Sequence, residues 1–307
     1  MTAMNLSLRR ILPVLGLAAT LAACDTNAPD AGALTPAETA VAASIVAQAV
    51  ADQSEGMVSD LYDMDAGLDA TGLGYGEGAM GKGRGKPGMG DRRGGLRQDG
   101  RVVYDPATGT HRVQYTRTVE SPVLKKALSV DLAYVFTDAA GGFLARPRAD
   151  RDLVAKVTFA GERKGSSTLT RRDGATHASA FEREASWALA GLTGASATFA
   201  GEQASKGSFR TVGADGVTNE RAFTATLRTD GVTITKANAG DGVEDAITGT
   251  LAYTVTMRRV QGAGDPQTRE VTGTIELAGN GRALLRFMGL PGKYRVDLST
   301  GDVAAEG

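Results

Sequence analysis

The sequence is poor in cysteine, histidine and aromatic residues, and each shortage excludes something. It has one cysteine and two histidines among 307 residues, and aromatic residues make up only 5%. One cysteine excludes an intrachain disulfide and a cysteine-based metal site, and two histidines alone cannot supply the three or four ligands of a protein zinc site. The fold must therefore be held by its core without covalent links, and the few aromatic residues predict a thin core.

The first apolar run is too short to span a membrane. It extends from Ile11 to Ala23, carries no charge and follows Arg9 and Arg10. A helix needs about twenty residues to cross a hydrocarbon layer about 30 Å thick. A positive start followed by a short apolar run is typical of a secretory signal peptide, so we expect residues 1–23 to be removed from the mature chain.

The end of this run, Leu21-Ala22-Ala23-Cys24, resembles the lipobox of bacterial lipoproteins. The resemblance covers only the signal region. It implies cleavage between Ala23 and Cys24, a diacylglyceryl group on the Cys24 thiol, and a protein anchored in the cell envelope, facing the periplasm or the exterior. The alternative is an ordinary signal peptide cut after Ala23, which would leave a free thiol open to oxidation. Asp25 resembles the inner-membrane retention signal of enteric bacteria, and the choice between inner and outer membrane stays open.

Charge is distributed unevenly along the chain. Lysine and arginine are absent from residues 25–81, which carry ten acids, whereas residues 82–101 carry seven basic residues against Asp91 and Asp99. Loss of two arginines with the signal peptide leaves 32 basic residues from 34, against 35 acidic ones, a net charge of −3. This balance predicts no nucleic-acid partner. Lys82–Arg101 is a candidate contact for an anionic envelope lipid or glycan, or a linker whose charges keep it hydrated.

Residues 35–65 are predicted to form one amphipathic helix. Thr35 suits the N-cap, Pro36 the first helical position, and Glu38 a capping box with Thr35. Apolar residues recur at helical spacing along one face, namely Val46, Val50, Met57, Leu61 and Met64. Gly56 weakens the middle, where the helix would divide in two. The polar face is acidic, whereas helices at membrane surfaces favour basic faces, so we expect the stripe to dock on the protein's own sheet.

Residues 24–34 are predicted to be a polar tether and residues 66–100 a flexible linker. Eleven of the 24 residues from 72 to 95 are glycine, and such a segment buries too little apolar surface to offset the entropy of ordering it. It contains formal matches to nucleotide-binding patterns at Gly76–Gly81 and Gly76–Lys82. Both are expected by chance at this glycine density, because no strand precedes them and no serine or threonine follows the lysine.

Residues 101–303 alternate between apolar and polar residues, as strands with one buried face do. Two-residue turn signals separate the runs, at Asp173-Gly174, Asp215-Gly216, Asp230-Gly231 and Asn280-Gly281. No stretch in this range has a convincing helical pattern, so we expect a meander of roughly ten to thirteen strands. The predicted class is mainly β: a large antiparallel meander, either an open curved sheet or a half-barrel, preceded by one N-terminal helix and a glycine-rich linker.

Two groups of residues resemble metal sites only superficially. Asp63–Asp69 matches a calcium loop at its first two acids, with its glycine one place early, so the acidic end of a helix is the simpler interpretation. His111 and His177 each lie on a strand pattern without neighbouring ligand residues, as expected of lone surface histidines.

Glu182 and Glu184 are the candidate pair of carboxylates for acid–base catalysis. They lie two residues apart on a predicted strand and share the face opposite Phe181 and Trp187. An exposed pair there would lack the shifted pKa that acid–base catalysis usually needs. The sequence therefore predicts no catalytic, metal or cofactor site.

The combined expectation is a non-enzymatic, membrane-anchored envelope lipoprotein with a binding or structural role. The alternative is a carrier of lipid or another apolar ligand, held in a half-open barrel. A carrier should have an apolar cavity on the Trp187 side, a structural protein a sheet covered by the N-terminal helix, and an enzyme a deep polar cleft with convergent acids. Nothing in the sequence sets the oligomeric state.

Overall fold

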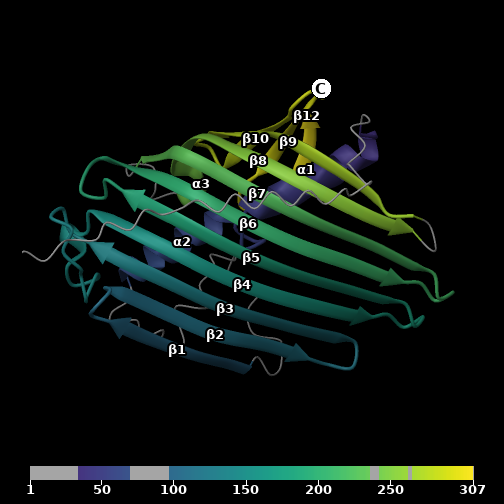
Figure 1. Cartoon of the computed structure of the whole chain (residues 1–307), viewed down its shortest axis with the longest axis horizontal. Helices are drawn as coiled ribbons and strands as arrows, with labels where there is room; N and C mark the ends of the chain where they lie inside the picture. Colours follow the sequence, from purple (N-terminus) through teal and green to yellow (C-terminus); the bar gives the residue numbers. More distant parts are fainter. Residues whose placement is uncertain (1–33, 70–96, 236–241, 262–264, 307) are drawn as a thin grey trace, which may run out of the picture.

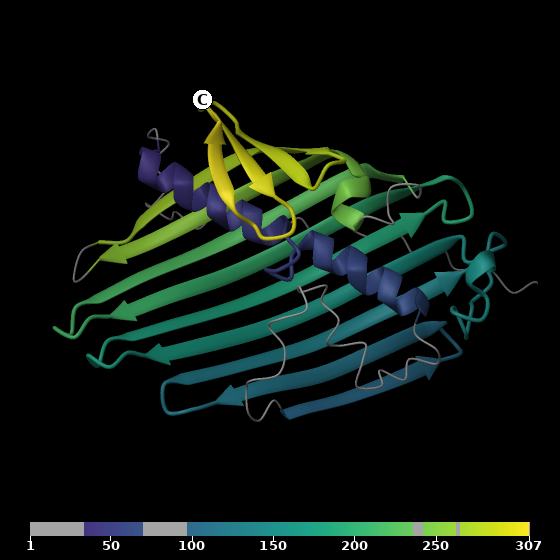
Figure 2. The same ribbon diagram turned by 180° about the vertical axis from the view of Figure 1, so that it is seen from behind.

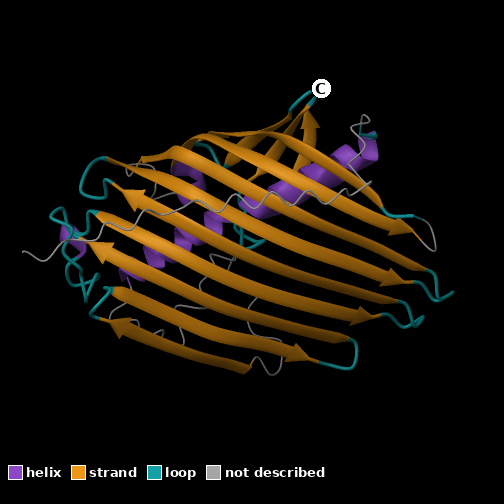
Figure 3. Cartoon of the chain, viewed as in Figure 1, coloured by secondary structure: helices purple, strands orange, loops and turns teal. Residues whose placement is uncertain are grey.

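The computed structural model describes residues 34–69, 97–235, 242–261 and 265–306. Within these residues, one antiparallel sheet of twelve strands pairs in chain order (Figure 1, Figure 3). The strands are β1 (Arg97–Asp105), β2 (Thr110–Glu120), β3 (Leu124–Thr137), β4 (Lys156–Thr170), β5 (Thr176–Ala190), β6 (Ser196–Val212), β7 (Thr218–Thr235), β8 (Ile247–Gln261), β9 (Gln267–Ala278), β10 (Arg282–Phe287), β11 (Lys293–Asp297) and β12 (Val303–Glu306). The strand order leaves β1 and β12 at the two edges, so the sheet is open. The predicted class is confirmed.

Two helices, α1 (Pro36–Val50) and α2 (Met57–Asp69), cover one face of this sheet (Figure 2). The first, α1, packs over β7 and β8, while β11 and β12 fold over its other side. The second, α2, packs over β4 and touches the four-residue helix α3 (Val243–Ala246). None of the helices in the described ranges has the length and hydropathy to cross a membrane.

The prediction of a single helix over 35–65 is wrong, because the chain breaks between α1 and α2. Ala51 is extended, Glu55 adopts a left-handed φ of 56°, and Gly56 has no room for a side chain, since a Cβ there would lie 2.5 Å from the Val50 carbonyl carbon. Gly56 is thus the expected weak point. The predicted capping box between Thr35 and Glu38 is present.

The turn between β11 and β12 holds the broken segment in place. The N–H groups of Asp52 and Gln53 donate to the carbonyls of Leu298 and Ser299, at 2.9 and 3.0 Å. Backbone groups that a continuous helix would have used internally are therefore satisfied by the sheet.

The predicted linker over 66–100 is too long at both ends. Residues 66–69 belong to α2, and β1 begins at Arg97. The strands also extend beyond the predicted end at 303, to Glu306. The tether, the signal peptide and the glycine-rich segment with its formal nucleotide motifs fall in residues 1–33 and 70–96, outside the described residues.

The helical stripe and the inner face of the sheet form one core. Each of the five predicted stripe residues is at most 2% exposed: Val46, Val50, Met57, Leu61 and Met64. They belong to the same buried cluster as the large side chains of the strands, among them Tyr134, Phe136, Phe159, Trp187 and Phe199. The expectation that the helical stripe docks on the sheet is confirmed.

One predicted hairpin is wrong. Asp230-Gly231 does not end a strand, because β7 continues through it to Thr235, with an irregular register between Arg228 and Thr233 against β8. The neighbouring strand β6 has its own irregularity between Phe199 and Gly201. The two bulges lie next to each other and let both long strands bend together, and bulges are a common cause of such bends.

Candidate functional site

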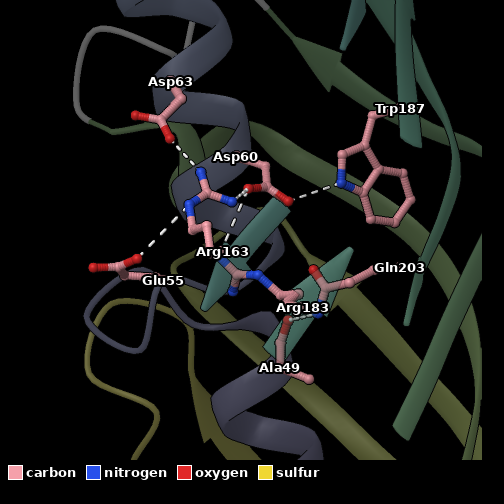
Figure 4. A network of polar contacts seen from close by, with 8 residues as sticks. All are labelled: Ala49, Glu55, Asp60, Asp63, Arg163, Arg183, Trp187 and Gln203. Carbon is pink, nitrogen blue, oxygen red and sulfur yellow. Dashed lines mark hydrogen bonds and ion pairs between the residues drawn. The ribbon is translucent and has the colours of Figure 1, made fainter. Parts of the chain in front are cut away.

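A network of buried charges joins α2 to the sheet, and Asp60 is its centre (Figure 4). The Asp60 side chain has no exposed surface. Its carboxylate accepts a hydrogen bond from Nη1 of Arg163 and another from Nε1 of Trp187, at 2.9 Å for the latter. Charge-assisted hydrogen bonds of this kind are stronger than neutral ones, so Asp60 fixes the side of α2 that faces β4 and β5.

Arg163 of β4 collects three carboxylates from the helical segment. Besides Asp60, its guanidinium donates to Asp63, and Nε lies 3.7 Å from Oε2 of Glu55 (Figure 4). Arg163 is 2% exposed. The planar guanidinium can serve several carboxylates at once, which a lysine ammonium does less well in a fixed geometry.

Arg183 of β5 is buried beside this network but makes fewer polar contacts than Arg163. Its Nη2 lies 3.8 Å from Oδ1 of Asp60, and its Nε and Nη2 have no hydrogen-bond partner among the described residues. Next to it, Gln203 of β6 donates to the carbonyl oxygen of Ala49 at 3.0 Å (Figure 4). Gln203 thereby satisfies one of the free carbonyls at the end of α1.

Burial and charge shift the pKa values of these groups in different directions. Burial raises the pKa of Asp63 to about 6, although Arg163 opposes the shift. Burial by itself would lower the pKa of Arg163, but the attraction of Asp60 and Asp63 outweighs it and holds that pKa above its ordinary value. For Arg183, burial and the positive charge of Arg163 lower the pKa against the attraction of Asp60.

The arrangement is suited to holding a helix on a sheet rather than to catalysis. Asp60 is occupied by its donors, and its surroundings are the core residues of α2, β4 and β5. A broad hollow of the described part of the chain lies elsewhere and has none of Asp60, Arg163 and Arg183 in its lining. A substrate would have no access to these charges without separating α2 from the sheet.

That hollow, with a volume of about 880 Å³, lies on the face of the sheet that the helices leave uncovered. Its floor is made largely of small residues from β4 to β8, among them Ala160, Ser186, Ala204, Thr226 and Ala252. Opposite charges on adjacent strands cross it, including Arg112 with Asp131 at 2.8 Å and Arg228 with Glu202 at 2.6 Å. The surface of this hollow is therefore polar and open to solvent, and these charged side chains are paired with opposite charges on the adjacent strand.

Glu162, Glu182 and Glu184 come together on this polar face, with ligand atoms within 4.8 Å of one another. The sequence had singled out the last two and their shared face opposite Trp187, and the structure confirms that face and adds Glu162 from β4. Lys206 lies 2.8 Å from Glu182, and Lys164 pairs with both Glu162 and Glu182. The Lys206 hydrogen bond lowers the pKa of Glu182. Glu162 and Glu182 thus belong to an ion-pair network with the two lysines, next to the exposed Glu184.

The two histidines are not the lone surface side chains that the sequence predicted. His111 is 2% exposed, lies 3.0 Å from the carbonyl oxygen of Leu144 and packs against the rings of Tyr104 and Phe136. Burial lowers its pKa, so it is neutral at pH 7. His177 is half-buried, with Nδ1 3.2 Å from the Thr211 hydroxyl. The alternating pattern places His111 on the same inward face as Val113, but the polar side chain of His111 led to the prediction of an exposed position.

The buried charge network was not identified from the sequence. Asp60 lies beside Leu61 in the helical stripe, and Arg163 and Arg183 occupy inward positions in β4 and β5. Charges at such positions break the alternating pattern, and that break is the signal that could have identified them. The acidic segment from Asp63 is helical, as predicted, rather than a calcium loop, and Asp63 itself pairs with Arg163.

Comparison with known proteins adds no relative to this description. No family model matches the chain, and neither the curated proteins nor the solved structures contain a match.

Proposed function

We propose that the chain is a lipid-anchored protein of the bacterial cell envelope that acts without catalysis, as a binding module presenting the polar face of its sheet. The anchor would be the diacylglyceryl group on Cys24, which follows Leu21, Ala22 and Ala23 in a lipobox pattern. The observation that supports the binding role is that the helices cover one face of the sheet and leave the other face accessible. The helices α1 and α2 cover much of one face, and the hollow lies on the other face, which they leave uncovered.

This arrangement favours binding over the carriage of an apolar ligand. A carrier needs an apolar cavity of several hundred cubic ångströms. On the inner face, Trp187 is 1% exposed and donates its N–H to Asp60, so the space beside it is filled by α2. The large hollow lies on the opposite face, where small and charged side chains suit a hydrophilic partner.

The enzyme alternative receives less support than either of these. Of the three converging acids, Glu162 and Glu182 are paired with Lys164 or Lys206, and the pKa of Glu182 is lowered rather than raised. An acid with a lowered pKa at an exposed position is a weak general acid or base at neutral pH.

Native mass spectrometry of protein purified from its own membranes tests the proposal. We expect a mature chain beginning at Cys24 that carries covalent acyl groups and no firmly bound free lipid. A stoichiometric lipid that survives detergent exchange would support the carrier instead.

The matching prediction is that Cys24→Ala blocks lipidation and maturation, because the thiol is the attachment point. The variant should accumulate as an unprocessed precursor, as measured by its mass and by membrane fractionation. Processing and fractionation identical to the wild type would overturn the lipoprotein assignment.

A further inference from the structure

The helix-covered side of the sheet is not covered along its whole length. The turns β2–β3, β4–β5 and β6–β7 lie at one end of the sheet, on the left in Figure 2, whereas α2 packs on β4 toward the other end. Near these turns the inward positions carry apolar side chains that stay accessible. Phe181 is 40% exposed, Phe209 45% and Leu169 39%, and the neighbouring Phe223 is half-buried.

Phe181, Phe209 and Phe223 lie on three adjacent strands and are here called the aromatic patch, and Leu169 of β4 shares their face of the sheet. Phe181 pairs in register with Gly165 and Gly207, and Phe223 pairs with Gly207 on its other side. A Cβ at either glycine would lie within 2.4 Å of the paired ring. The glycines therefore let the rings lie down across adjacent strands, and Phe209 stacks on Phe223 with centroids 6.1 Å apart.

Basic residues surround the aromatic patch on the same face. Arg221 of β7 is the register partner of Phe209 and, on its other side, of Arg259 in β8. Like charges placed directly opposite each other destabilise a sheet. Lys126 of β3 and Arg117 of β2 lie on the same face toward the other edge, with Arg117 stacked 5.3 Å from the Tyr115 ring.

Acids are scarce on this part of the face. The inward positions of β2–β9 that border the aromatic patch hold no aspartate or glutamate among the described residues. The nearest acid contributed by α1 is Glu38, which lies 3.8 Å from Arg269 of β9. On the side of β7–β9 this carboxylate is outnumbered by Arg221, Arg259 and Arg269, so that side of the patch is positive. On the side of β2–β4 the nearby carboxylates Glu55 and Asp63 are paired with Arg163.

The proposed lipid anchor would leave the fold at this same end. Glu38 is in the first turn of α1, and its contact with Arg269 places that turn beside the aromatic patch, because Arg269 pairs with Met257 and Met257 with Phe223. Leu34 lies ten residue steps after Cys24, and an extended chain of ten steps reaches at most about 33–36 Å. A bilayer holding the anchor therefore lies within reach of the patch.

We propose that the aromatic patch and its rim of Lys126, Arg221 and Arg259 rest on an anionic phospholipid bilayer as a second membrane contact. Phenylalanine is common on the membrane-facing side of interfacial segments, and the cations suit lipid phosphates. A lipid chain combined with a basic patch is a known route to stable membrane attachment. The proposal uses the anchor position from the proposed function, but the surface itself is tested without the anchor.

The test is co-sedimentation of the unlipidated Cys24→Ala mature chain with vesicles of phosphatidylcholine, with or without phosphatidylglycerol. We expect binding only to vesicles with phosphatidylglycerol, weakening as salt is added. Arg221→Glu should reduce the binding at least about fivefold, the effect of roughly one cation near an anionic surface. Arg210→Glu is the matched control, because Arg210 lies on the adjacent strand at the same end but on the opposite face.

A second pair of variants tests the apolar part. Phe209→Ser should weaken vesicle binding with an unchanged melting temperature, whereas Phe143→Ser, at an equally exposed phenylalanine outside the patch, should leave binding intact. The proposal is overturned if the wild-type chain does not bind the anionic vesicles, or if Arg221→Glu and Arg210→Glu behave alike. It is also overturned if Phe209→Ser lowers the melting temperature without affecting vesicle binding, since the patch would then be covered by the protein itself. Because these chains carry no lipid, none of these results bears on Cys24 acylation.

Discussion

Asp60 accepts hydrogen bonds from Arg163 and Trp187 at a position with no exposed surface. A buried ion pair contributes little over a well-packed apolar pair, but removal of one partner leaves the other charge buried and uncompensated. Loss of Asp60 would leave Arg183 without this carboxylate and Arg163 with only Asp63 and Glu55, at the edge of the network. The network therefore makes the docking of α2 specific to one position on the sheet.

We predict that Asp60→Ala lowers the free energy of unfolding by about 3–5 kcal/mol. Urea unfolding followed by Trp187 fluorescence would measure it directly, since the indole is one of the groups that lose a partner. Glu202→Ala is the control, because Glu202 pairs with Arg228 in an exposed position and such pairs contribute only about 0–1 kcal/mol. Equal effects of the two variants would contradict the role assigned to Asp60.

Asp63 should give the stability a pH dependence of unusual sign. Its pKa in the folded protein is about 6, above the value near 4 expected for the unfolded chain. The folded state therefore holds this proton more tightly, and the contribution of Asp63 to stability falls as pH rises from about 4 to about 6. The fall continues through the folded-state pKa and levels off about one pH unit above it.

The measurement is the difference in unfolding free energy between the wild type and Asp63→Asn across this pH range. It should decrease as pH rises through about 6 and become flat about one pH unit higher. Asp131→Asn should behave in the opposite way, because the Arg112 hydrogen bond lowers the pKa of Asp131, and its stabilisation is lost only as pH falls. A difference for Asp63 that rises with pH would show that its pairing with Arg163 dominates.

At the level of elements, α1 and α2 act as the second layer of the core. Without them the inner face of a one-layer sheet would expose its largest side chains to water. Their placement is fixed by contacts at several points, such as Gln203 on the end of α1 and the backbone pairing of Asp52 with Leu298. A second tie joins α2 to α3, where the Tyr62 hydroxyl donates to Glu244 and accepts from the N–H of Val243.

Leu61→Ala should therefore cost about 2–5 kcal/mol of stability, the usual range for truncation of a buried leucine. Leu61 is 2% exposed and belongs to the common core. Gln48→Ala, on the exposed side of α1, should change the stability by no more than about 0.5 kcal/mol. Thermal unfolding of the unlipidated chain compares the two, and equal midpoints would place α2 outside the cooperative fold.

At the level of the whole molecule, the helices decide whether the sheet stays soluble. Without the helices, the apolar inner face of the sheet would be exposed, and exposed apolar surfaces promote association between chains. The edge strands β1 and β12 offer further places where chains can pair. We predict that a chain lacking residues 25–69 aggregates or binds a hydrophobic dye strongly, as measured by light scattering and fluorescence. A deletion variant that remains monomeric with an unchanged melting temperature would show that the helices serve a partner rather than the core.

Several features follow from the sequence alone, because they depend on local patterns. Alternation in residues 101–303 determines a mainly β fold, and Thr35, Pro36 and Glu38 determine where the first helix begins. The stripe from Val46 to Met64 indicates which side of the helical segment is buried, and Gly56 marks where it breaks. The lipobox at Cys24 is a local pattern of the same kind and remains a prediction.

Other features were decided only by the tertiary structure, because they depend on residues far apart in the chain. The carboxylate of Asp60 meets Arg163 and Trp187 only when α2 lies across β4 and β5. Asp230-Gly231 has the composition of a hairpin turn, but pairing with β6 and β8 on both sides carries β7 through it as a bulge. Burial of His111, and exposure of Phe181 and Phe209 at equally inward positions, depend on which part of the sheet is covered. A strand pattern gives the face of each side chain, but only the packed layers determine whether that face meets protein or water.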